Sequence, residues 1–200
     1  MPPSPTSLPK PRLILASRSP RRRELLAAAG YDFEVRRPSE DAESGFVPDE
    51  TPSELVARLA YQKAADVAGH IDEGLVLGCD TVAECRGQVL GKPDDEAHAR
   101  AMLQSLNGRK HRVLSGVCLW KEPGASSLVR VDVTTLRMDP LSERQIDDYL
   151  AGGAWQGKAG AFGYQDRLDW VHVLEGSETN VVGLPMELLD EMLAEVAGHA

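Results

Sequence analysis

A cluster of polar and cationic residues follows an apolar run near the start of the chain. Leu13–Ala16 leads into Ser17, and Ser19 and Pro20 have the form of a helix N-cap and first helical residue. Residues 21–23 are all arginine and occupy the expected first turn, where the helix dipole is already positive. Backbone N–H groups, hydroxyls and guanidinium groups at such a turn would bind phosphate. The local pattern equally allows a solvated arginine cluster in which Arg22 or Arg23 pairs with an acid elsewhere.

A second candidate is Asp80, which directly follows the strongly apolar run Leu75–Cys79. The carboxyl end of a strand in an open α/β sheet is where ligands bind. The same aspartate could instead cap a turn through Thr81 and the amides that follow. We favour the functional interpretation because turn capping does not need so buried an approach.

Three further polar residues have weaker signals when each is taken alone. Lys63 falls beside the apolar stripe of an expected helix, where a lysine usually extends to water but can also reach into a site. Lys92 lies in the tight turn Gly-Lys-Pro, which is not a P-loop and is typical of a surface lysine. Gln165 lies in the glycine-rich stretch 155–166 and could read a base edge or simply satisfy backbone groups. No GxGxxG sequence follows a strand there, so a dinucleotide site is not supported.

Composition limits the classes of partner. The 200 residues have a formal net charge of −9, with 42% hydrophobic and 26% charged residues, as in a globular protein with one core of good size. Sequence-independent binding of nucleic acid needs a broad basic face, which an acidic chain lacks. The arginines near the start are a local exception, and they suit a small anionic ligand better than a duplex.

Several other classes are excluded by missing signals. The three cysteines have no zinc-like spacing, and we interpret them as reduced thiols of a cytoplasmic protein. Apolar runs stay shorter than the ~18 residues of a membrane span. Residues 1–10 have no apolar signal region and are expected to form a flexible tail. The histidines accompany no GxSxG elbow, so we reject a hydrolase triad.

Apolar periodicity and capping signals predict mixed strands and helices. Strands are expected at residues 12–16, 31–35, 75–79, 111–120, 127–137 and 171–174, with a short hairpin directly after residue 81. Helices are expected at 19–29, 52–68, from 94 or 95 to 106, at 140–150 and from 185 onward, with loops at 37–50 and 176–183. Hairpins and crossovers together indicate an α/β or α+β fold with a mixed sheet.

An anion cradle, carboxylates and lysines together are the inventory of metal-assisted phosphoryl chemistry. Carboxylates hold a hard divalent cation, cations neutralise a polyphosphate, and a carboxylate orients or deprotonates water.

The same residues resemble the Maf family of nucleoside triphosphate pyrophosphatases, over nearly the whole chain from Arg12 to Leu189. The motifs that carry the resemblance stand in the family's order: Leu15-Ala-Ser-Arg-Ser-Pro-Arg-Arg-Arg-Glu-Leu-Leu26, Gly78-Cys-Asp-Thr-Val82, Leu90-Gly-Lys-Pro93, Lys158-Ala-Gly160 and Glu175-Gly-Ser-Glu-Thr-Asn-Val-Val-Gly-Leu-Pro185. The resemblance implies a two-lobed α/β mixed-sheet fold with a central cleft, similar to inosine triphosphate pyrophosphatases, with residues 11–200 as one domain. It also implies cleavage between the α and β phosphates, a Mg²⁺ or Mn²⁺ requirement and a homodimer.

The resemblance assigns roles position by position. Asp80 matches the catalytic carboxylate that accepts a proton, and it also holds the metal. The positions expected to bind the phosphates are Ser17, Arg21, Arg22, Lys63 and Lys92. Glu43 matches the second acidic residue of the metal site, with Glu40 and Asp41 as competitors because the loop register is open.

The residue after the catalytic aspartate separates the family's subgroups. Thr81 resembles the type that cleaves dTTP and UTP, whereas the 7-methyl-GTP type tends to have glutamine there. Arg21 and Gln165 match the other two positions linked to base choice. Cys79 replaces the alanine usual in this type, and the run before Gln165 departs from the family pattern, so substrate breadth stays open. Cleavage of dTTP and UTP would include removal of non-canonical nucleotides. The alternatives are a 7-methyl-GTP or broad specificity, and a non-catalytic nucleotide-binding regulator of cell division.

Overall fold

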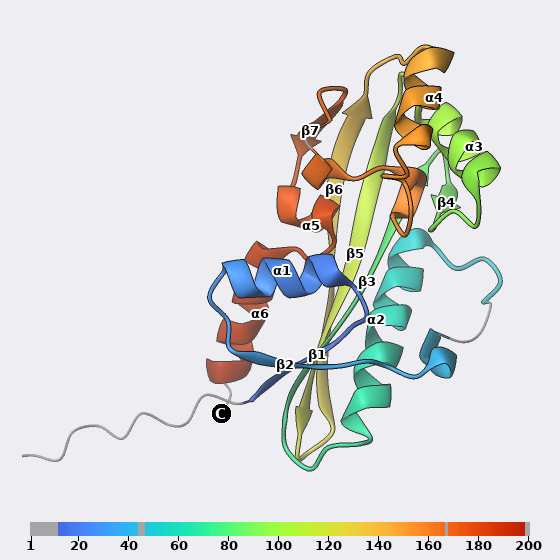
Figure 1. Ribbon diagram of the computed structural model, residues 1–200. Coiled ribbons are helices and arrows are strands. Elements are labelled where there is room, and N and C mark those ends of the chain that lie inside the picture. Colours follow the sequence, from blue (N-terminus) through green and yellow to red (C-terminus); the bar gives the residue numbers. More distant parts are fainter. Residues whose placement is uncertain (1–11, 44–46, 167, 199–200) are drawn as a thin grey trace, which may run out of the picture.

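The computed structural model describes residues 12–43, 47–166 and 168–198. The tail expected at residues 1–10 lies outside these ranges. The strands are β1 (Leu13–Ala16), β2 (Phe33–Arg36), β3 (Gly74–Cys85), β4 (Gln88–Leu90), β5 (Lys110–Glu122), β6 (Ser126–Met138) and β7 (Val171–Glu175). The α-helices are α1 (Pro20–Ala28), α2 (Pro52–Ala68), α3 (Glu96–Leu106), α4 (Glu143–Ala151), α5 (Glu178–Val182) and α6 (Met186–Gly198). Short 3-10 helices are η1 (Glu40–Glu43), η2 (Ala159–Ala161) and η3 (Tyr164–Asp166) (Figure 1).

The helices begin where the capping residues stand in the sequence. The side chain of Ser19 accepts a hydrogen bond from the backbone N–H of Arg22, with proline in the first turn. Thr51 and Glu54 form a reciprocal capping box at the start of α2. Asp95 caps α3 by accepting from the N–H of His98. The capping signals therefore predicted these three starts correctly.

A single mixed sheet joins all the strands of the described residues. It has seven strands in the order β2-β1-β3-β5-β6-β7, with β4 paired to β3 off this path. The strands β2, β1 and β3 are parallel, whereas β3, β5, β6 and β7 pair antiparallel. The structure thus confirms the mixed α/β class.

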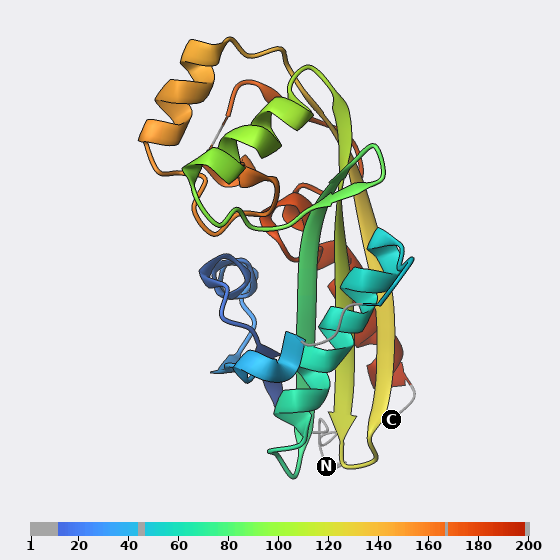
Figure 2. The ribbon, with the colours of Figure 1, turned by 90° about the vertical axis from the view of Figure 1, so that its right-hand side faces the viewer.

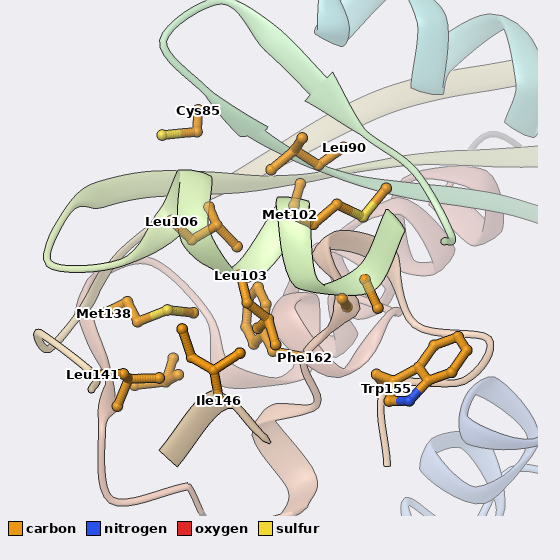
Figure 3. Close-up of a cluster of buried hydrophobic side chains, with 14 of the residues drawn as sticks. Cys85, Leu90, Met102, Leu103, Leu106, Met138, Leu141, Ile146, Trp155 and Phe162 are labelled. Atoms are coloured by element: carbon orange, nitrogen blue, oxygen red, sulfur yellow. The ribbon is translucent and has the colours of Figure 1, made fainter. Parts of the chain in front are cut away.

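Two lobes share the long strands of this sheet. Figures 1 and 2 show β1, β2, α1, α2 and α6 around one end of β3 and β5, and β4, β7, α3 and α4 around the other. We call these groups the first and the second lobe. The largest buried cluster of the second lobe packs α3 and α4 against the sheet, with Leu103, Leu106, Ile146 and Phe162 at its centre (Figure 3).

The alternation of side chains along β3 decides which helices each of its residues meets. Leu75, Leu77 and Cys79 pack in one cluster with residues of α1 and α6. Val76 belongs to the opposite cluster, which contains residues of α2. By this alternation Asp80 faces the side of α2, and Thr81 faces the side of α1.

Two expectations about local structure were wrong. Asp80 does not end a strand, because β3 continues unbroken through it from Gly74 to Cys85. The first half of β3 pairs with β1 and its far end pairs with β4, so the expected strand and the start of the expected hairpin are one element. The loop expected at 176–183 contains the short helix α5, which Ser177 caps.

Glycines let α2 lie unusually close to the sheet. A Cβ atom on Gly78 would lie 2.2 Å from the carbonyl oxygen of Ala60, and one on Gly116 would lie 2.1 Å from that of Val56. Gly116 is also the register partner of Asp80. These two glycines therefore fix how near α2, and the side chains it carries, can approach the centre of β3.

Replacing Gly116 with alanine is expected to destabilise the fold by about 1–3 kcal/mol, because the new methyl group must push backbone away. Urea unfolding measures this change. Gly69→Ala is the matched control, since its Cβ would make only ordinary contacts of 3.6 and 3.7 Å. Equal stability of the two variants would show that the close approach does not constrain α2.

Candidate functional site

The candidate site lies where β3 has one unpaired edge. Pairing with β1 ends at Ala16 opposite Gly78, and pairing with β4 begins at Ala83. On its other edge β3 pairs with β5 without interruption. Residues 79–82 therefore have a strand neighbour on one side only, at the boundary between the two lobes. A ligand at this edge can reach side chains from both faces of the sheet.

Arg22 projects from the first turn of α1 to this edge and is 9% exposed. Its Nε donates to the carbonyl oxygen of Gly183 at 2.8 Å, Nη1 donates to Ser17 Oγ at 3.3 Å and Nη2 donates to Thr81 Oγ1 at 3.0 Å. All three acceptors are uncharged. No carboxylate of the described residues forms an ion pair with Arg22, which removes the alternative in which it pairs with an acid. Arg23 is exposed, as a surface charge would be.

A buried cation without a counter-ion is costly in a protein interior. Ser17, itself 4% exposed at the end of β1, helps by accepting from Arg22 and from the N–H of Ser19. Neutral acceptors satisfy hydrogen bonds but leave the positive charge unbalanced. The arrangement is therefore suited to an anion arriving from outside.

A second group gathers on the α2 side of β3. Lys63 is 5% exposed, and its Nζ lies 2.5 Å from Asp80 Oδ1 and 3.1 Å from Glu43 Oε1. Asp80 is buried, whereas the Glu43 side chain is half exposed. Of the three acids proposed in the loop, only Glu43 meets Lys63 among the described residues. Glu40 Oε1 instead lies 3.7 Å from Arg18 Nη1, and Asp41 forms no ion pair with a described residue.

This group fits the donor set of a hard divalent cation. Two carboxylates from different elements converge on one point, which Lys63 Nζ occupies. Magnesium is commonly held by one or two carboxylates together with substrate phosphates and water. Among the described residues no group of three or more His, Cys, Asp or Glu side chains forms a complete metal site. Asp80 and Glu43 would therefore hold a metal only in combination with a ligand's own oxygens.

Lys92 lies in the loop between β4 and α3, with its side chain open to solvent. Partial desolvation is the main cause that lowers its pKa, and the charges of Lys63 and Arg22 lower it further. The charges of Glu43 and Asp80 act in the opposite direction and raise this pKa, so Lys92 lies near the charged residues of both groups.

Arg21 connects the two lobes. Its Nη2 donates to the carbonyl oxygen of Gly157, in the loop before η2, at 3.0 Å. Desolvation lowers the pKa of Arg21, as does the neighbouring charge of Arg22. Gln165 is exposed in η3, and no described hydrogen bond joins it to the other candidates. Within the described part of the chain, Gln165 is therefore not joined to the other candidates.

Two participants were missed from the sequence. Gly183 supplies a carbonyl oxygen that also accepts from Thr81 Oγ1 at 3.3 Å and from Cys79 Sγ at 3.4 Å. Burial raises the pKa of the Cys79 thiol, so the thiol keeps the proton that it donates. Ser115, fully buried on β5, lies 2.8 Å from Thr81 Oγ1. The turn Gly-Leu-Pro was a signal for Gly183, but nothing in the sequence marks Ser115.

The fold and this site define an α/β protein with a buried arginine that has neutral partners, close to a buried carboxylate. A family model described as "Maf-like protein" matches residues 12–196, and the chain belongs to the Maf family. A protein of Rhodopirellula baltica named dTTP/UTP pyrophosphatase is 54% identical over 94% of this chain and 83% of its own length. Proteins of the same name from Symbiobacterium thermophilum and an Anaeromyxobacter species are 44% and 46% identical, over 92% and 94% of this chain and 93% and 90% of their own lengths.

Solved structures give a fainter likeness. A nucleoside-triphosphatase named dITP/XTP pyrophosphatase from Mycobacterium abscessus covers 94% of this chain and 97% of its own, at 16% identity and a TM-score of 0.45. A HAM1 protein from Coxiella burnetii gives a TM-score of 0.47 at 14% identity, over 94% of this chain and 98% of its own.

Inorganic tripolyphosphate is expected to stabilise the protein because it supplies the missing counter-charge. At about 100 times Kd the gain is about 2.7 kcal/mol, which raises Tm by about 5–10 °C for a chain of this size. Thermal unfolding with and without tripolyphosphate measures it. Arg22→Gln should lose most of the rise, and Arg23→Gln should keep it. An unchanged rise in Arg22→Gln would contradict the assignment.

Proposed function

We propose that the chain hydrolyses dTTP and UTP to the nucleoside monophosphate and pyrophosphate. The relatives with that name are similar over almost the whole chain. The observation that carries the proposal is Arg22, a buried guanidinium with only neutral partners, which lies beside the pair of Asp80 and Lys63. A triphosphate supplies the charge that Arg22 lacks and presents a phosphorus to Asp80.

The chain's own residues then divide the work. Arg22 and Lys92, with the N–H groups at the start of α1, bind the triphosphate; Ser17 holds Arg22, and Arg21 faces the ligand from the same turn. Lys63 holds Asp80 Oδ1, and among the described residues Oδ2 has no hydrogen-bond partner. Asp80 Oδ2 is therefore free to accept a proton from water. That water attacks the α-phosphorus, the bond from the α-phosphorus to its bridging oxygen breaks, and pyrophosphate leaves.

A divalent cation fits this scheme. Asp80 and Glu43 would hold Mg²⁺ or Mn²⁺ together with the phosphates, with Lys63 close to both acids. When bound, the cation would neutralise phosphate charge and polarise the bond that breaks.

Base choice and assembly are parts of the same proposal. Thr81, Arg21 and Gln165 would favour a pyrimidine triphosphate, and the same site would remove non-canonical nucleotides by hydrolysing them. We also propose that the protein is a homodimer, that it is located in the cytoplasm and that it binds no nucleic acid stably. Sedimentation of the purified protein would test the dimer. Within the described residues no helix is long and apolar enough to cross a membrane.

Pyrophosphate release from a panel of nucleoside triphosphates tests the proposal. With Mg²⁺, dTTP and UTP should be cleaved to monophosphate and pyrophosphate faster than CTP, ATP, GTP or 7-methyl-GTP. Preference for 7-methyl-GTP would move the chain to the other subgroup. Binding of dTTP without release from any nucleotide would favour the non-catalytic regulator instead.

Asp80→Asn separates catalysis from binding in the same assay. The amide keeps the size of the side chain but is no longer a base, so turnover should fall roughly 10²-fold or more while dTTP still binds. Asp94→Asn, an exposed change in the loop before α3, is the control and should keep full turnover. Near-normal turnover by Asp80→Asn would show that another group activates the water.

A further inference from the structure

The hydroxyl group of Thr81 makes so many hydrogen bonds within the protein that it has none left for a nucleotide base. Thr81 Oγ1 accepts from Arg22 Nη2 at 3.0 Å and lies 2.8 Å from Ser115 Oγ and 3.3 Å from the carbonyl oxygen of Gly183. A hydroxyl has one proton to donate and two lone pairs that accept. The three contacts can therefore exhaust it.

The direction of each hydrogen bond follows from Ser115. This serine is fully buried, and Thr81 is the only hydrogen-bond partner of its hydroxyl among the described residues. If Thr81 donated to Ser115, the serine proton would remain buried without an acceptor, which is unfavourable. If Ser115 donates to Thr81, the threonine proton goes to Gly183, and both hydroxyls are satisfied.

We propose that Ser115 is a positioning residue of the triphosphate site, which acts through Thr81 on Arg22. Ser115 fixes the rotation of the Thr81 hydroxyl, and that hydroxyl then presents a lone pair to Arg22 Nη2. Gly183 completes the arrangement because it accepts from both Thr81 and Arg22 Nε. The inference deepens the proposed function and rests on it for the identity of the ligand.

A consequence concerns specificity. Since the Thr81 hydroxyl has no remaining proton or lone pair, it does not hydrogen-bond the base. Thr81 acts on base choice only through its size, and its hydroxyl acts on the phosphates through Arg22. Loss of the hydroxyl should therefore weaken the binding of all nucleoside triphosphates by the same factor.

A double-mutant cycle tests the coupling between Ser115 and Arg22, which do not touch. Ser115→Ala should weaken binding of tripolyphosphate, measured by calorimetry with Mg²⁺, about threefold to tenfold, the size of one net hydrogen bond. In an Arg22→Gln background the same change should have no further effect. An equal loss in both backgrounds, or no loss in either, would overturn the proposal.

Steady-state kinetics distinguish positioning from a general loss of structure. Ser115→Ala and Thr81→Val should each raise KM for dTTP and UTP by the same factor with kcat little changed, and Thr81→Ser should restore KM. Ser105→Ala, a partly buried serine bonded to Met102 in the second lobe, is the control and should leave KM unchanged. A changed ratio of dTTP to CTP cleavage in Thr81→Val, which keeps the size of the side chain but lacks the hydroxyl, would mean that the hydroxyl reads the base. If wild-type protein released no pyrophosphate, the proposed function would fail while the calorimetric cycle could still be read.

Discussion

The interruption of strand pairing along one edge of β3 is the constraint on which the site depends. The last residue of β3 that pairs with β1 is Gly78, and the first that pairs with β4 is Ala83. Between these two residues β3 continues without a strand neighbour on that side. Successive residues of a strand face opposite sides of a sheet, so Asp80 and Thr81 would normally be separated by the sheet itself. At an open edge, one ligand can meet both, and residues from α1 and α2 could therefore contact the same proposed triphosphate.

Close packing sets the second condition. Lys63 reaches Asp80 because Gly78 and Gly116 remove the side chains that would hold α2 away from the sheet. On the other face, Arg22 is held by Ser17, Thr81 and Gly183, which come from three distant parts of the chain. These hydrogen bonds orient the guanidinium of Arg22 but do not balance its charge. Such an arrangement is stable only if the fold around it is rigid, and it favours an anion in the free position.

Much of the fold was predictable from local signals. Capping residues predicted the starts of α1, α2 and α3, and apolar runs predicted the long strands β5 and β6. The break expected at Asp80 was wrong because a polar side chain on an open edge looks, in sequence, like the end of a strand. The short helix α5 was missed because its five residues give no periodic signal. For the site, the residue types at positions 17, 22, 63 and 80 predicted anion chemistry, and the structure brings Ser17 to Arg22 and Lys63 to Asp80. Ser115 and the carbonyl of Gly183 depend on pairing across β5 and on the approach of a distant turn, which no local pattern reports.

The most direct measurement of the central claim is the affinity of Asp80→Asn for dTMP, dTDP and dTTP, compared with the same protein carrying Arg22→Gln as well. Calorimetry on this slow variant avoids turnover during the titration. If Arg22 binds the polyphosphate, the affinity of Asp80→Asn should increase from dTMP to dTDP to dTTP. The added Arg22→Gln change should reduce that increase. Equal affinity for the three nucleotides, or a rise that survives the loss of Arg22, would contradict the account.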